Sequence, residues 1–308
     1  MKKTSMWTWI GLAVILLLSF YYLLFVQSSS AEKSQFEIDL AGMRSLTQAD
    51  FEKKSGPGAL NSLLIGEGAF PSGAILAGDS LISKTRLVFT AFQVLYPDGK
   101  QLILDTAQDK SLHEEFYQGE PFYADNYASL QSSMNQASWI VATHEHVDHV
   151  GGIAQSENFA AIKDQVFLTK EQLNGPTIEA ARFPAGNLEQ LKPLNYDGLH
   201  LIAPGVVLQK APGHSVGSQL IYVRRNDGQE FLFIGDIAWN LRNIEEQTGR
   251  PLLVSWIFLQ EDREQVAHQL RALLELKQSH PELQVVIAHD GDILERIRKS
   301  YGVGSSFQ

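Results

Sequence analysis

The segment 143–152 constrains the fold more than any other part of this chain. It reads Thr-His-Glu-His-Val-Asp-His-Val-Gly-Gly and follows the apolar run Trp-Ile-Val-Ala at 139–142. Four potential metal ligands fall within six residues: His144, His146, Asp148 and His149. Because side chains alternate along extended backbone, the first two histidines point to the same side. The paired glycines let the next element pack closely on its neighbour. Such a cluster can bind one metal and begin a second site.

Three more potential ligands follow strand-like apolar runs farther along the chain. They are His214, Asp236 and His289, after the runs 206–211, 231–235 and 283–288. Strand ends converge on one edge of a sheet, where α/β enzymes commonly place their sites. The chain contains no cysteine, so any metal must be held by His, Asp or Glu.

These seven residues resemble the metallo-β-lactamase superfamily, whose pattern is HxHxDH followed by a distant His, Asp and His. The resemblance implies an α/β fold, an αββα sandwich of the metallo-β-lactamase type. It also implies two metal sites, the first held by His144, His146 and His214 and the second by Asp148, His149 and His289. Asp236 would bridge the two metals.

Nitrogen and oxygen ligands favour two Zn²⁺ per chain, with iron or manganese as the alternatives. Two cations lower the pKa of a water between them, so a metal-bridging hydroxide can attack without a separate protein base. Asp148 is the candidate catalytic residue that relays the proton. The sequence therefore predicts a dinuclear-metal-dependent hydrolase.

Differences between this sequence and particular members of the superfamily narrow the class of substrate. The missing cysteine excludes the lactamase classes that use a Cys ligand, and a bridging Asp236 is more similar to lactonases, thioesterases and phosphodiesterases. The pair His289-Asp290 is similar to acyl-homoserine lactone lactonases. We therefore expect hydrolysis of an ester, lactone or related bond in a small molecule. The alternatives are a phosphodiesterase, a β-lactamase-like hydrolase and a non-catalytic binding module of the same fold.

Three aromatic residues are candidates for the substrate pocket. They are Trp239, Tyr196 and Tyr222. Each has packing in the core as its alternative role.

An apolar, uncharged run from residue 6 to residue 26 is long enough to cross a membrane. Lys2 and Lys3 precede it, so the positive-inside rule predicts a single-pass anchor with a cytoplasmic N-terminus. The catalytic domain would then be periplasmic or extracellular. Small residues at 28–31 leave a cleaved signal peptide, and hence a secreted protein, as the alternative.

The predicted organisation is a membrane anchor at 1–27, a flexible tether at 28–45 and a hydrolase domain at 46–308. The domain would open with a β-meander, with a hairpin turn at 97–99, and a later amphipathic helix is predicted at 262–278. The net charge of −10 makes nucleic acid an unexpected partner. The oligomeric state does not follow from these patterns.

Overall fold

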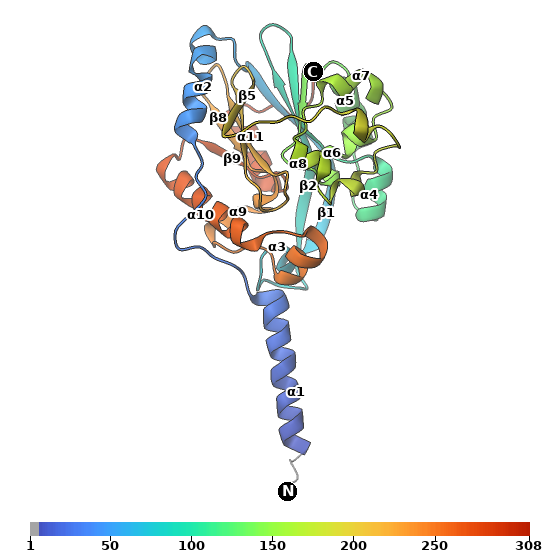
Figure 1. Ribbon diagram of the computed structural model, residues 1–308, viewed down its shortest axis with the longest axis vertical. Coiled ribbons are helices and arrows are strands. Elements are labelled where there is room, and N and C mark those ends of the chain that lie inside the picture. The colour runs from blue at the N-terminus through green and yellow to red at the C-terminus, as the bar shows by residue number, and fades with distance from the viewer. Residues whose placement is uncertain (1–5) are drawn as a thin grey trace.

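The computed structural model describes residues 6–308. Two β-sheets pack face to face, with helices on both outer faces, and a long N-terminal helix projects from one end (Figure 1). Lys2 and Lys3, on which the predicted membrane orientation depends, lie outside the described residues. The expected αββα sandwich is confirmed.

The first sheet has the strand order β1-β2-β3-β4. Its strands are β1 (Ala59–Pro71), β2 (Lys84–Leu95), β3 (Gln101–Thr106) and β4 (Trp139–Val141). The first three are antiparallel, as the meander predicted, and β4 runs parallel to β3. β1 stays paired with β2 as far as Pro71, opposite Lys84.

The second sheet has the strand order β5-β6-β7-β8-β9. Its strands are β5 (Leu199–Ala203), β6 (Val206–Lys210), β7 (Gln219–Arg224), β8 (Glu230–Phe233) and β9 (Gln284–Val286). β8 and β9 are parallel, and the other pairs are antiparallel. Buried side chains of both sheets form one core, in which the ring centroids of Phe92 and Phe233 lie 4.8 Å apart.

Helices cover both outer faces (Figure 1). α5 and α6 contact the first sheet, and α2 contacts β5, β6 and β7. The α-helices are α1 (Met6–Tyr21), α2 (Leu40–Lys53), α3 (Ser72–Ile75), α4 (Lys110–Phe116), α5 (Ala124–Met134), α6 (Val147–Ala154), α7 (Phe159–Ile162), α8 (Lys170–Asn174), α9 (Leu241–Glu245), α10 (Arg263–Ser279) and α11 (Gly291–Tyr301). Short turns of other helix types are η1 (Tyr22–Val26), η2 (Lys163–Gln165), η3 (Ile178–Ala181), η4 (Leu188–Gln190), η5 (Gly235–Ile237) and η6 (Val254–Leu259).

Close packing of α6 on β3 depends on the glycine pair. A Cβ added at Gly152 would lie 2.3 Å from the carbonyl oxygen of Thr106, and one at Gly151 would lie 2.9 Å from that of Ala107. Any larger side chain would push α6, and the ligands at its start, away from the sheet.

The segment 28–45 differs from the flexible tether that its composition predicted. The Ser34 hydroxyl donates to the carbonyl of His268 at 2.8 Å, and the backbone amide of Asp39 donates to the Gln209 side chain at 3.1 Å. α2 then begins at Leu40, with Leu40 and Met43 buried in the core. The polar groups of this segment form hydrogen bonds with polar groups on the surface of the domain. Composition alone does not distinguish a segment bonded in this way from a flexible one.

Candidate metal centre

All seven predicted ligands come together where the carboxyl ends of strands from both sheets meet. His144, His146, Asp148 and His149 follow β4, while the other three follow β6, β8 and β9. Their ligand atoms form two groups, each within 4.8 Å. One group is His144, His146, His214 and Asp236, and the other is Asp148, His149, Asp236 and His289.

Asp236 belongs to both groups, and its two carboxylate oxygens have overlapping sets of partners. Oδ2 lies 3.5 Å from Nε2 of His214, 3.9 Å from Nε2 of His144 and 3.1 Å from Nε2 of His289. Oδ1 lies 3.2 Å from Nε2 of His149 and 3.0 Å from Nε2 of His289. A carboxylate in this position can contact two cations, one through each oxygen.

The polar atoms at the centre have the chemistry of a metal site. Nε2 of His144, His146 and His149, and Oδ1 of Asp236, are buried without a hydrogen bond among the described residues. The short contacts of Oδ1 with Nε2 of His149 and of His289 bring these atoms together without hydrogen-bond geometry. Buried polar groups are otherwise almost always hydrogen-bonded. Imidazole and carboxylate donors converging at this spacing fit Zn²⁺.

Asp105 at the end of β3 orients the second group. Its Oδ2 lies 3.0 Å from Nδ1 of His149, which leaves Nε2 of that ring directed at Asp236. Asp105 also accepts the backbone amide of Thr143 at 2.7 Å, so it ties β3 to the ligand loop. Metal-binding histidines are commonly held by such a carboxylate on their other nitrogen.

Glu261 and Arg250 support the first group. Nδ1 of His214 lies 3.2 Å from Oε2 of Glu261, and Arg250 pairs with the same carboxylate. Arg250 also donates to the carbonyl of Asp236 at 2.9 Å and lies over the Trp239 ring. Both charged side chains are almost fully buried, so this pair positions two ligands at once.

The charges of the centre shift the pKa values of its groups in opposite directions. Burial lowers the pKa of His144 and of His146 well below the ordinary imidazole value. Burial would also lower the pKa of His149, but Asp105 and Asp236 outweigh it and raise that pKa. Neutral imidazoles in the first group are the form that binds a cation.

Glu145, between the first two histidines, turns away from the centre. Its buried carboxylate accepts the Ser215 hydroxyl at 2.8 Å, and burial raises its pKa. It therefore ties the loop of His144 and His146 to the loop of His214.

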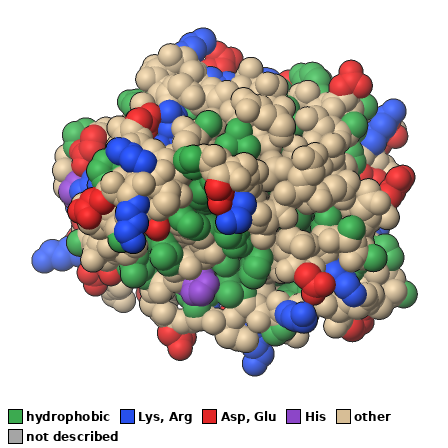
Figure 2. All heavy atoms as spheres, turned by 90° about the horizontal axis from the view of Figure 1, so that it is seen from above, with side chains coloured by type: hydrophobic (Ala, Val, Ile, Leu, Met, Phe, Trp, Pro, Cys, Tyr) green, Lys and Arg blue, Asp and Glu red, His purple; other side chains and the backbone are tan. Residues whose placement is uncertain are grey.

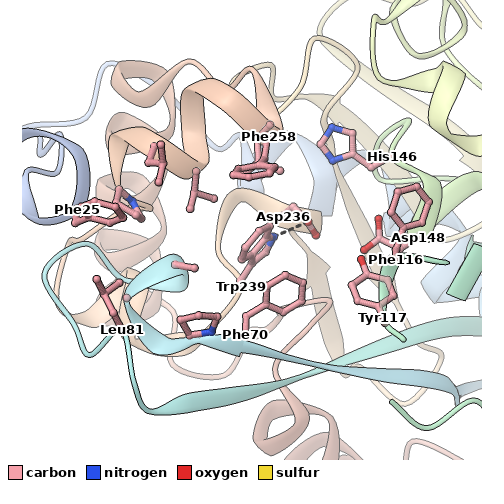
Figure 3. A pocket seen from close by; sticks show the side chains of 17 residues that line it. Phe25, Phe70, Leu81, Phe116, Tyr117, His146, Asp148, Asp236, Trp239 and Phe258 are labelled. Carbon is pink, nitrogen blue, oxygen red and sulfur yellow. Dashed lines mark hydrogen bonds between the residues drawn. The ribbon is translucent and has the colours of Figure 1, made fainter. Parts of the chain in front are cut away.

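A cavity of about 650 Å³ opens beside the centre. His146, Asp148 and Asp236 lie at one side of it, and most of the remaining wall is apolar or aromatic (Figure 3). Trp239 lines the cavity, and its indole Nε1 donates to Oδ2 of Asp236 at 2.6 Å.

Tyr196 and Tyr222, the other two candidate pocket residues, are not among the described residues that line this cavity. The Tyr196 hydroxyl donates to Gln219 at 2.7 Å, and the buried Tyr222 hydroxyl donates to Glu230. Both side chains are buried in the main hydrophobic core, Tyr222 from within β7 and Tyr196 from the loop before β5. Tyr117, just after α4, is a tyrosine that does line the cavity. Burial and the nearby Asp148 and Asp236 raise its pKa well above the ordinary value.

Several solved structures share this fold. An N-acyl homoserine lactone hydrolase with N-hexanoyl-L-homoserine bound at its catalytic metal centre superposes with a TM-score of 0.60 at 16% identity, covering 78% of this chain and 96% of that one. AidC, a dizinc quorum-quenching lactonase, gives a TM-score of 0.56 at 16% identity, covering 77% and 92%.

Proteins of similar sequence belong to the same group as these structures. An N-acyl homoserine lactonase of Bacillus cereus is 28% identical over 114 residues, which are 35% of this chain and 42% of that protein. Residues 94–289 match the metallo-beta-lactamase superfamily as a whole, and they include all seven predicted ligands. The chain therefore belongs to the metallo-beta-lactamase superfamily.

Proposed function

We propose that this protein is a dinuclear-metal-dependent hydrolase that opens an ester or lactone in a small molecule with an apolar acyl group. The observation that carries the proposal is Asp236, whose carboxylate belongs to both groups of converging ligand atoms. Several of those atoms, among them Nε2 of His144 and of His149, are buried without a hydrogen-bond partner among the described residues. His144, His146 and His214 would hold one Zn²⁺, Asp148, His149 and His289 the other, and Asp236 both. When bound, such a pair of cations makes hydroxide available near neutral pH and polarises the scissile carbonyl.

The side chains around the centre have separate tasks. Asp148 is partly exposed to the cavity, and its Oδ2 lies 3.4 Å from Nε2 of His289. It is therefore placed to hold a proton and pass it to the leaving alkoxide. Trp239 holds Asp236 by its indole hydrogen bond and gives the cavity an aromatic wall.

Two features favour a lactone or ester over a phosphodiester. Among the described residues, no arginine or lysine that would bind a phosphate lines the cavity, and Phe70, Trp239 and Phe258 offer contacts for an acyl chain. Lactonases of N-acyl homoserine lactones, with an acyl chain beside the scissile ring, also share the fold.

We further propose that residues 1–27 anchor the domain to a membrane and place it outside the cytoplasm. Met6–Val26 forms a helix long and apolar enough to cross a bilayer, and no residue in the 18-residue apolar window of this span is buried. A signal sequence has the same properties, so the mass of the mature protein distinguishes an anchor from a cleaved leader.

The test of function compares the initial hydrolysis of an acyl lactone with that of an activated phosphodiester, each with zinc and with a chelator. We expect the lactone to be opened faster than the phosphodiester, and we expect the chelator to abolish this activity.

We expect Asp236→Ala to lower kcat/KM by at least about 100-fold and to reduce the zinc content, because this residue contacts both sites. Full activity of the variant would contradict the two-metal centre. Preference for the phosphodiester would replace the lactonase proposal with phosphoryl transfer, and a bound but unchanged lactone would favour a binding module.

A further inference from the structure

A patch of exposed hydrophobic side chains borders the cavity. Five residues define this patch, which we call the apolar rim: Leu81, Ile82, Trp256, Ile257 and Phe258. Ile82 is 93% exposed, and Trp256 and Phe258 are about 70% exposed. They come from the loop between α3 and β2 and from η6, far apart in sequence but lining or flanking one cavity. Contiguous exposed apolar surface on a folded domain marks an interaction site.

The end of the N-terminal helix lies at the same place. Phe25, in η1, lines the cavity together with Leu81 and Phe258. The amide of Gly78 donates to the carbonyl of Phe25 at 2.8 Å, and the amide of Gly249 donates to the Ser28 hydroxyl at 2.9 Å. The helix is thus seated on the two segments that carry the rim, at the base of the domain (Figure 1).

The segments that form the apolar rim lack charged residues, as expected of a surface that contacts lipid. No charged residue occurs in 80–83 or 251–259, the segments that supply the rim. The face farthest from α1 instead carries Lys, Arg, Asp and Glu side chains around its edge (Figure 2). Trp256 adds an aromatic side chain of the kind enriched at bilayer interfaces.

The cavity connects this surface to the metal centre. Phe25 and Leu81 lie at the side opposite His146 and Asp148, with Trp239 and Phe258 between them (Figure 3). An acyl chain entering past the rim would meet apolar side chains until its polar end reached Asp148 and Asp236.

We propose that the apolar rim docks on the bilayer from which α1 emerges, and that the cavity draws long-chain acyl substrates directly from that lipid. The occupant of the rim is the lipid surface, because a helix able to span the bilayer ends against it. The substrate part rests on the proposed hydrolase function, whereas the docking part rests only on the proposed membrane anchor.

The first experiment tests docking without any assay of activity. The chain contains no cysteine, so a single cysteine introduced into the full-length protein takes a fluorophore at one position only. Ile82→Cys and Ile257→Cys report on the rim. Leu46→Cys and Leu201→Cys are the controls, since these exposed apolar residues lie on α2 and β5. The labelled proteins are reconstituted in phosphatidylcholine vesicles containing lipids with a nitroxide on the acyl chain.

We expect the nitroxide lipids to quench labels at 82 and 257, and aqueous iodide to quench labels at 46 and 201. Equal quenching by iodide at all four positions would overturn docking. A cleaved mature protein found only in the aqueous phase would do the same.

The second experiment tests the supply of substrate. The zinc-loaded protein is reconstituted in vesicles that contain a dodecanoyl lactone. The double variant Ile82→Ser, Ile257→Ser should hydrolyse this lactone at a rate lower by roughly tenfold or more, because two bilayer contacts are lost. Hydrolysis of a water-soluble butanoyl lactone should stay unchanged, and Leu46→Ser with Leu201→Ser should change neither. An equal loss on both substrates, or no loss on either, would overturn delivery from the lipid. Failure of the unmodified protein to open any lactone would reject the proposed lactone hydrolysis, while the quenching result would still decide docking.

Discussion

At the scale of single residues, the centre depends on carboxylates that never face the cavity. Asp105 holds Nδ1 of His149 and the amide of Thr143, so it sets both the direction of a ligand and the path of its loop. We expect Asp105→Asn to weaken zinc binding by about 10- to 100-fold, because the neutral amide holds the imidazole less strongly. Competition with a chelating dye measures this affinity. Asp98→Asn, in the exposed hairpin turn, is the matched control and should bind zinc normally. Wild-type affinity in the Asp105 variant would show that His149 needs no such support.

At the scale of elements, α2 is attached to the second sheet by a partly buried ion pair. Arg44 donates from Nε to Glu230 at 2.9 Å, and the Tyr222 hydroxyl bonds to the same carboxylate. Burial raises the pKa of Glu230, but the bonds from Arg44 and Tyr222 outweigh it, so the pKa lies below its ordinary value of 4.5. A depressed carboxyl pKa stabilises the fold above the ordinary pKa, and this contribution is lost as the pH falls through the folded-state pKa.

Glu230→Gln should therefore lower the free energy of unfolding at pH 7 by about 1.5 to 3 kcal/mol. The difference from the wild type should shrink below about pH 4, where the wild-type carboxylate also begins to be protonated. Urea unfolding at several pH values measures this. Glu282→Gln removes the exposed partner of the same arginine and should have little effect. A pH-independent loss in the Glu230 variant would mean that packing, not charge, fastens α2.

At the scale of the whole molecule, the ligands come from the strand ends of both sheets, so bound metal would connect the two layers of the sandwich. A ligand that binds only the folded state stabilises it by about 2.7 kcal/mol at 100 times its Kd. For a domain of this size, we expect a chelator to lower Tm by roughly 5 to 10 °C. Calorimetry with and without chelator measures the shift, and Asp236→Ala should abolish it. An unchanged wild-type Tm would argue against zinc bound across the sheets.

Much of the centre was predictable because the ligands lie just after apolar, strand-like runs, and strand ends meet at a sheet edge. Asp105 follows such a run too, but a single aspartate after a strand does not stand out from an ordinary turn residue. The roles of Glu261 and Arg250 could not be predicted from the sequence, because they reach His214 from distant, polar parts of the chain.

The sequence by itself determined the fold family, the seven candidate ligands and an N-terminal segment suited to a membrane, since these depend on residue type, order and local periodicity. Only the tertiary structure decided which side chains share space. It buried Tyr196 and Tyr222 in the core, placed Tyr117 at the cavity, and laid the supposed tether along the domain. It also brought Phe25 to the apolar rim, because contacts between segments more than fifty residues apart depend on how the layers pack.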